Sequence, residues 1–163
     1  IVIGTFVYAI FVKPLGHFSG YAGSLALAII MIPVVLRTTE EMISLVPWEI
    51  REAAFALGAP YYKVILQIVY RGAATGIFTG ILLAIARIAG ETAPLLFTSF
   101  NNMFLTTNMN EPMPSLTVTI YQYAMGPYDD WHEMAWAASF VITMFILGLT
   151  ILGRLIIRLK YKN

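Results

Sequence analysis

Two ionisable residues, Arg87 and Glu91, stand inside an otherwise apolar stretch of the chain. A charge at the centre of a membrane span costs about 2.5 to 3.5 kcal/mol on insertion scales, whereas an i, i+4 ion pair on a helix returns only about 0.2 to 0.5 kcal/mol. Pairing with Glu91 therefore does not account for Arg87 at this depth. A packing salt bridge is one interpretation. An anion pathway is the other, because a guanidinium presents a planar fork of donors to two oxygens of an oxyanion.

Small residues recur every four positions along the same stretch, at Gly72, Gly76, Gly80 and Ala84. This spacing is typical of a face on which another helix approaches closely. At about 100° per residue, Arg87 and Glu91 would lie within an arc of about 80° with the positions of that face from Gly76 onward, so we expect both charges to face protein. Counting about 1.5 Å per residue from Ala73 places Arg87 about 21 Å along the span. Pro94 predicts a kink or a helix end near the outer surface.

The composition restricts the class of protein. Of the 163 residues, 59% are hydrophobic and 12% are charged, and the mean hydropathy is +0.77, which leaves too little polar surface for a water-soluble domain. The net charge of +1 lacks the basic excess of a nucleic-acid binder. Because the sequence has no cysteine, it contains no disulfide framework, thiol nucleophile, zinc finger or iron–sulfur cluster.

The hydropathy pattern predicts an all-α, polytopic transmembrane domain over residues 1–163. Three apolar runs approach the roughly 20 residues that a hydrocarbon layer of about 30 Å requires, and we expect spans at residues 19–36, 73–97 and 133–157. A fourth run, residues 1–12, is too short to cross and lacks the features of a signal peptide. We interpret it as part of a truncated span, which predicts a missing N-terminal portion.

The distribution of basic residues predicts the orientation of these spans. Residues 98–132 contain no Lys or Arg, whereas the segment 37–72 and the C-terminus contain Arg37, Arg51, Lys63, Arg71, Arg154, Arg158, Lys160 and Lys162. Because basic residues stay on the cytoplasmic side, we expect 37–72 and the C-terminus to be cytoplasmic and 98–132 to form an external loop. Residues 115–125 of that loop are expected to form a short interfacial helix.

The cytoplasmic segment is expected to contain two helices. Pro47 can open the first and Gly58 can close it; a second follows over residues 61–69. In the first helix an apolar stripe is formed by Ile50, Ala53, Ala54 and Leu57, and the residues expected to turn away from it are Glu49, Arg51 and Glu52. Periodicity alone leaves two interpretations, a hairpin resting on its own membrane domain or a docking helix for a soluble partner.

A spaced pattern within this segment consists of Glu52, Ala53, Ala54, Gly58 and Ile68. It resembles the E-A-A-x3-G-x9-I-x-L-P loop of permease subunits in bacterial ABC importers. In that family the loop forms coupling helices that insert into a cleft of the ATPase subunit. The resemblance therefore implies that Glu52, Ala53, Ala54 and Gly58 contact the ATPase or support that contact. The sequence departs from the pattern at Tyr70-Arg71, where the family has Leu-Pro.

The stretch from Arg87 to Phe97 reads R-I-A-G-E-T-A-P-L-L-F and is similar to the R-x-x-G-E-T-A-P-L-L-F stretch of phosphate-specific permeases of the PstA type. Residues 120–123 and 131–138 also resemble the C-terminal half of that subunit. The resemblance implies the type I ABC importer permease fold, in its C-terminal portion, and transport of inorganic phosphate by alternating access. It implies a substrate pathway that includes Arg87, Glu91 and Thr92, without a catalytic residue, a metal or a cofactor.

The resemblance also implies an assembly in a bacterial or archaeal plasma (inner) membrane, surrounded by lipid. Its other members would be a related PstC-type permease subunit, two copies of a cytoplasmic ATPase and an external phosphate-binding protein. No G-x-x-x-x-G-K-[ST] loop occurs in the sequence. We therefore expect this chain to be a transport subunit and ATP hydrolysis to take place in a partner.

The residues alone leave other functions open. A permease for sulfate, molybdate or phosphonate would use the same oxyanion chemistry, and a passive anion channel would also use an Arg-lined route but would not need a docking helix. An intramembrane enzyme would need a nucleophile and a base, or metal ligands, at depth, which Arg87 with Glu91 does not supply. Polar residues start the last span, where solvated side chains are expected more often than metal ligands: Asp129, Asp130, His132 and Glu133.

Overall fold

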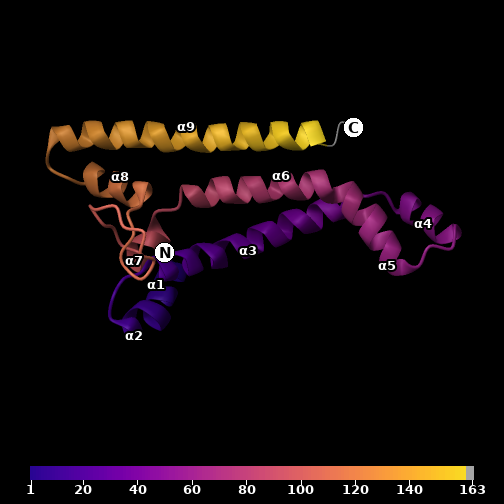
Figure 1. Cartoon of the computed structure of the whole chain (residues 1–163), viewed down its shortest axis with the longest axis horizontal. Coiled ribbons are helices and arrows are strands. Elements are labelled where there is room, and N and C mark those ends of the chain that lie inside the picture. The colour runs from indigo at the N-terminus through magenta and orange to yellow at the C-terminus, as the bar shows by residue number, and fades with distance from the viewer. Residues whose placement is uncertain (161–163) are drawn as a thin grey trace. The chain divides into compact units, whose positions relative to one another are not determined.

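The computed structural model describes the backbone of residues 1–160 and the side chains of residues 1–156. Over these residues the chain consists of helices and connecting loops, with no strand (Figure 1), which confirms the all-α class. Three basic residues used for the orientation of the C-terminus, Arg158, Lys160 and Lys162, lie outside the described side chains.

Within the described part of the chain, three helices are long and apolar enough to cross a membrane, as the sequence predicted. The first is α3 (Gly20–Ser44). The second is a continuous helix made of α5 (Tyr61–Lys63), the π-helical turn η2 (Val64–Val69) and α6 (Tyr70–Ala89). The third is α9 (Asp129–Lys160), whose apolar part is Asp129–Ile156. The N-terminal run forms the shorter elements α1 (Val2–Val7), η1 (Tyr8–Val12) and α2 (Lys13–Leu15).

The expected span at residues 73–97 is wrong in its outer part. The helix ends at Ala89, and a separate short helix, α7 (Ala93–Thr98), begins after Thr92. Pro94 has no N–H to donate to the carbonyl of Gly90, so a helix continued through this point would lose a hydrogen bond; in the first turn of α7 the missing N–H costs nothing. The helix end predicted from Pro94 is therefore confirmed.

At both ends of the segment 37–72 the long helices extend beyond the expected spans. Helix α3 continues eight residues past position 36 to Ser44, and the second predicted helix, residues 61–69, continues without a break into α6. At this point Arg71 stands where the family pattern has Pro and, unlike proline, has an N–H to donate.

The chain divides into two compact units, and α3, α6 and α9 contribute residues to both. Unit 1 comprises Ile1–Ile32 and Ala86–Leu149. Within it α1 packs on α7, and a Cβ added to Gly4 would lie 2.9 Å from the Cα of Pro94. The short helix predicted at 115–125 is present as α8 (Leu116–Ala124). The loop before α8 caps the N-terminus of α3, because Gly20 donates its N–H to the carbonyl of Glu111 at 3.1 Å.

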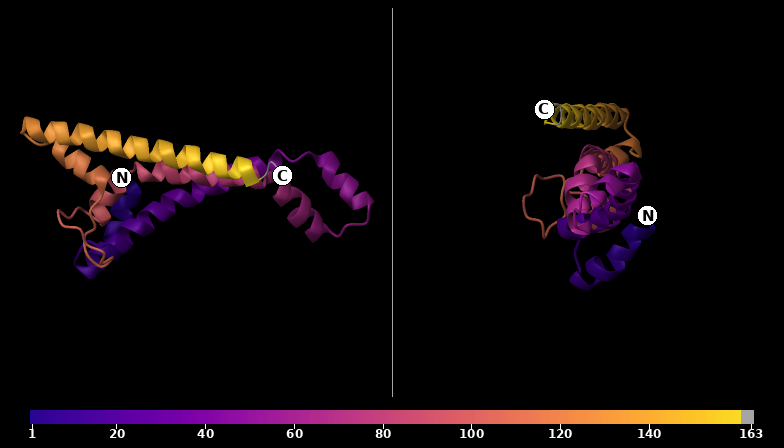
Figure 2. Two further views of the ribbon diagram at one scale, coloured as in Figure 1. Left: turned by 45° about the horizontal axis from the view of Figure 1, so that its top comes forward. Right: turned by 90° about the vertical axis from the view of Figure 1, so that its right-hand side faces the viewer.

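Unit 2 comprises Pro33–Ile85 and Thr150–Asn163. Here α3 approaches the small-residue face of α6 as the spacing predicted. A Cβ added to Gly80 would lie 2.9 Å from the Oγ1 atom of Thr38, and one added to Gly76 would overlap the side chain of Met42. Between α3 and α5 the chain forms one further helix, α4 (Trp48–Ala56). Figure 2 shows α4 and the α5–η2 segment as two separate helical pieces joined by a loop.

Candidate functional site

Helix α4 has well-defined ends that the sequence predicted. Pro47 occupies the N-cap position with an extended ψ of 142°. At the other end Gly58 adopts a left-handed φ of 79°; its N–H donates to the carbonyl of Phe55 at 2.9 Å, and the N–H of Ala59 donates to the carbonyl of Ala54 at 3.2 Å. These two hydrogen bonds form a Schellman motif, which satisfies carbonyls left unpaired at the end of a helix.

Gly58 is required for its backbone conformation and not for lack of space, because a Cβ added there meets no atom within 4 Å. A left-handed conformation costs a non-glycine residue about 1 to 2 kcal/mol, and asparagine tolerates it better than a β-branched residue. We therefore expect Gly58→Val to speed amide hydrogen exchange at Ala59 by about 5-fold to 30-fold, measured by mass spectrometry, and Gly58→Asn to change it much less. Equal exchange rates in the two variants would contradict this role.

The predicted apolar stripe of α4 is largely uncovered within the chain. Ala54 is 7% exposed, whereas Ile50 is 50% and Leu57 is 88% exposed. Leu57 is the C-cap residue, at the end of the helix, and only Ala54 of the stripe is fully buried. Part of the stripe nevertheless packs within unit 2, since Ile50 lines a pocket with Met42 and Ile68. The hairpin and the docking helix therefore both stay predictions.

Three of the four predicted coupling residues, Glu52, Ala53 and Gly58, are exposed, and Ala54 is buried. All four lie on α4 or its C-terminal cap. Glu52 accepts a hydrogen bond of 2.6 Å from the indole Nε1 of Trp48, one turn earlier. The carboxylate is thus held at the surface of the helix with its charge exposed to solvent.

Arg51, which the sequence places off the apolar stripe, contacts the backbone at the end of α3. Its Nη2 donates to the carbonyl of Ile43 at 2.9 Å and, at a longer 3.4 Å, to that of Val46. Its guanidinium carbon lies 5.9 Å from the centre of the Trp48 ring. Periodicity did not find this role because the contact is made across the turn between α3 and α4 and not along one helix.

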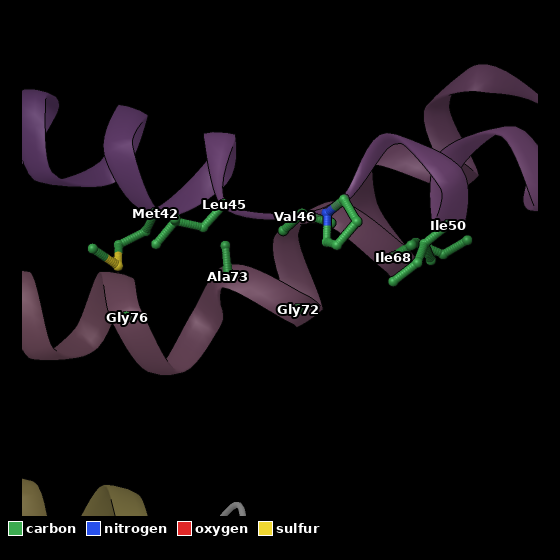
Figure 3. Close-up of a pocket in the computed structure, with 9 residues that line it drawn as sticks. Met42, Leu45, Val46, Ile50, Ile68, Gly72, Ala73 and Gly76 are labelled. Carbon is green, nitrogen blue, oxygen red and sulfur yellow. The ribbon is translucent and has the colours of Figure 1, made fainter.

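A pocket of about 470 Å³ opens beside α4 within unit 2. Figure 3 shows Met42 from α3, Ile50 from α4 and Ile68 from η2 around it. Its floor includes the glycines Gly72 and Gly76. No charged side chain lines it, so the pocket suits an apolar group and not an anion.

The three predicted pathway residues lie in different backbone elements. Arg87 lies in the last turn of α6 and is exposed, whereas Glu91 follows the end of that helix and is half-buried. The N–H of Glu91 donates to the carbonyl of Ile88 at 3.0 Å, and its own carbonyl accepts from the hydroxyl of Thr117 at 3.4 Å. Thr92 is half-buried at the N-cap position of α7.

The expectation that Arg87 and Glu91 share one helical face is wrong, because the helix ends at Ala89. The packing salt bridge is not formed: among the described residues the ion pairs are those of Arg37 with Glu40 and Glu41. The side chain of Arg87 is exposed within this chain, so that it faces protein in the assembled permease stays a prediction. The guanidinium therefore has no carboxylate partner in the part of the chain that the structure describes.

The polar residues at the start of α9 do not converge. Among the side chains described, no group of three or more His, Asp or Glu is placed to hold a metal ion. His132 instead lies with its Nε2 2.9 Å from the carbonyl oxygen of Gly126.

Comparisons with known proteins identify the family. Binding-protein-dependent transport system inner membrane components match residues 1–160. The phosphate transport system permease protein PstA of Haemophilus influenzae is 55% identical over 160 residues, which are 98% of this chain and 57% of that protein. The protein of the same name from Pasteurella multocida is 54% identical over 162 residues, covering 99% and 58%.

A more distant relative is the probable phosphate transport system permease protein PstA of Methanocaldococcus jannaschii, 41% identical over 150 residues, 91% of this chain and 53% of that protein. The chain spans about half the length of these curated relatives. No solved structure matches it significantly. On the match over residues 1–160, the chain belongs to the family of binding-protein-dependent transport system inner membrane components.

Proposed function

We propose that this chain is part of the membrane permease of an ATP-driven importer of inorganic phosphate, which moves its substrate by alternating access. The observation that carries the proposal is the 55% identity, over 98% of the chain, to a relative named as a phosphate transport system permease. Three helices able to cross a membrane agree with a multi-pass transport component. Energy would come from a separate ATPase, because this sequence contains no phosphate-binding loop of the Walker type.

In this proposal α4 docks into the ATPase on the cytoplasmic side, with Glu52, Ala53 and Gly58 at or beside the contact and Ala54 supporting it from below. The exposed apolar residues of this region support the assignment. Trp48 is 60% exposed, and tryptophan is enriched among the residues that anchor the centres of protein interfaces; Leu57, 88% exposed, adds apolar surface beside it.

Arg87, Glu91 and Thr92 are proposed to line the phosphate pathway. Arg87 supports this assignment because its guanidinium is exposed and unpaired among the described residues, so its charge remains available to an anion. A guanidinium matches two phosphate oxygens and stays protonated when partly desolvated. The carboxylate of Glu91 and the hydroxyl of Thr92 lie close by in the sequence, on the loop where α6 ends.

The complete transporter would contain a PstC-type permease subunit, two copies of the ATPase and an external phosphate-binding protein. The lack of Lys and Arg in residues 98–132 supports placing that segment on the external side, and the basic residues of 37–72 support placing those on the cytoplasmic side. The C-terminus would then also be cytoplasmic.

The test is uptake of radiolabelled phosphate by cells that express the full-length parent protein with its partner subunits, with and without ATP depletion. Unlabelled phosphate, sulfate, molybdate and phosphonate serve as competitors. We expect ATP-dependent uptake that only phosphate suppresses.

Suppression by another oxyanion would keep the importer and reject phosphate as its substrate. Uptake indifferent to ATP depletion would favour the passive anion channel instead.

A further inference from the structure

We propose that Arg51 is a positioning residue that fixes α4 to the C-terminal end of α3, so that a displacement of α4 by the ATPase moves a membrane span. The transmission of movement rests on the proposed function of α4 as the coupling helix. The attachment of one helix to the other rests only on contacts within unit 2.

The contacts of Arg51 match what the end of a helix requires. Helix α3 ends at Ser44, and the guanidinium hydrogen bonds to the carbonyl oxygens of Ile43 and Val46, at and just beyond that end. The last carbonyls of a helix lack the usual i+4 partner and carry the negative end of the helix dipole; that of Ile43 also accepts the N–H of Val46 at 3.3 Å, so Arg51 is a second donor there. A cationic donor therefore supplies both a hydrogen bond and a favourable charge at this point.

The guanidinium is enclosed and not simply resting on the surface. The Nε atom of Arg51 is buried and makes no hydrogen bond. The guanidinium carbon lies over the Trp48 ring, 5.9 Å from the ring centre. Leaving a donor unpaired is costly, so the remaining contacts must hold the group in place. Lysine could not reproduce them, because a single ammonium lacks both the planar face and the fork of donors.

The position of Arg51 makes these contacts mechanically significant. Eight residues separate it from Ile43, and the turn between the two helices, residues 45–47, lies inside that interval. Hydrogen bonds across the turn restrict the angle at which α4 leaves α3. Other contacts of α4 within unit 2 are its packing against η2 and the stacked rings of Phe55 and Tyr61, and none of them bridges this turn.

Arg37 provides a matched control on the same unit. Its side chain is 69% exposed, and its ion pairs join it to Glu40 and Glu41 on its own helix. Removing it eliminates one positive charge near the same end of α3 but no link to α4.

The first experiment measures coupling in the complete transporter, reconstituted with its ATPase and binding protein. Arg51→Ala is expected to bind the ATPase normally and retain ATP hydrolysis, while phosphate transported per ATP falls by about tenfold, the effect of losing one charge-assisted hydrogen bond. Arg37→Ala should behave as the unaltered protein. Unchanged coupling in Arg51→Ala, or an equal loss in Arg37→Ala, would overturn the transmission of movement.

The second experiment tests the attachment without any transport assay. Spin labels are placed on the full-length permease in lipid nanodiscs through Leu36→Cys on α3 and Glu49→Cys on α4, both at exposed positions, and the distance distribution between them is measured by pulsed electron resonance. Arg51→Ala and Arg51→Lys are expected to broaden the distribution by about twofold, whereas Arg37→Ala leaves it unchanged. Lysine is included because it is the milder change if alanine prevents assembly.

The two experiments separate this inference from the proposed function. A distribution that Arg51→Ala and Arg51→Lys leave unchanged would overturn the attachment even if the complex imports phosphate. Broadening of the distribution in a permease whose unaltered complex imports no phosphate would reject the proposed function and still support the attachment.

Discussion

Arg87→Gln is expected to lower phosphate uptake by about a hundredfold, the upper range for losing a hydrogen bond to a charged group, while the permease still assembles. Glutamine keeps much of the side-chain length and some donor capacity but removes the charge. Arg87 is exposed in the last turn of α6 and pairs with no carboxylate among the described residues, so the substitution breaks no ion pair there. The measurement is uptake of radiolabelled phosphate in cells without another copy of the permease, normalised to permease in the membrane.

Two further variants control this result. Arg87→Lys keeps the positive charge but loses the planar fork, so we expect intermediate uptake. Arg71→Gln makes the same substitution at an exposed arginine in the first turn of α6, and uptake should remain close to that of the unaltered protein. Near-normal uptake by Arg87→Gln would remove Arg87 from the proposed pathway.

Glu52→Lys is expected to weaken association with the ATPase by at least about tenfold. The proposed partner surface complements a negative carboxylate, and the substitution puts a positive charge in its place. It also removes the acceptor for the indole N–H of Trp48, now bonded at 2.6 Å. Association is measured by pull-down of the ATPase subunit with the full-length permease in detergent.

Glu52→Gln separates the two effects of that substitution. The amide oxygen still accepts the hydrogen bond from Trp48 but carries no charge. If the charge governs docking, Glu52→Gln should also bind the ATPase more weakly; if the position of Trp48 governs it, Glu52→Gln should bind normally. Unchanged association in both Glu52→Lys and Glu52→Gln would contradict a role for Glu52 in docking.

The existence of the three long apolar helices could be predicted because hydropathy depends on composition over a window of residues. The ends of α4 were also predictable, since the φ of proline and the left-handed tolerance of glycine are properties of single residues. The bounds of the spans were less accurate. Hydropathy marks the apolar part of a helix and not its polar ends. It therefore does not predict that α3 continues past Arg37 to Ser44, or that the second long helix begins at Tyr61.

The charged pair shows how the end of one helix changes a site. Pro94 predicts a helix end, whereas the spacing of Arg87 and Glu91 predicts a shared face only for a helix that continues beyond Ala89. Once α6 ends, the angle of 100° per residue no longer applies, and Glu91 is positioned by hydrogen bonds with Ile88 and Thr117. Thr117 is 26 residues away in the sequence, a separation that periodicity does not address.

The sequence by itself therefore determined the all-α membrane class, the capped helix α4 and, through its motifs, the resemblance to a transport family, because these depend on residue type and on short, regular spacing. Tertiary structure alone decided that Arg51 turns back to the carbonyls of Ile43 and Val46, that Ala54 of the apolar stripe is buried while Leu57 is exposed, and that Arg87 is left without a carboxylate partner among the described residues. The physical reason is that these outcomes depend on where two segments meet across a turn or a helix end. The place where two segments come together depends on packing and on the hydrogen-bonding needs of backbone groups, which a pattern of residue types does not predict.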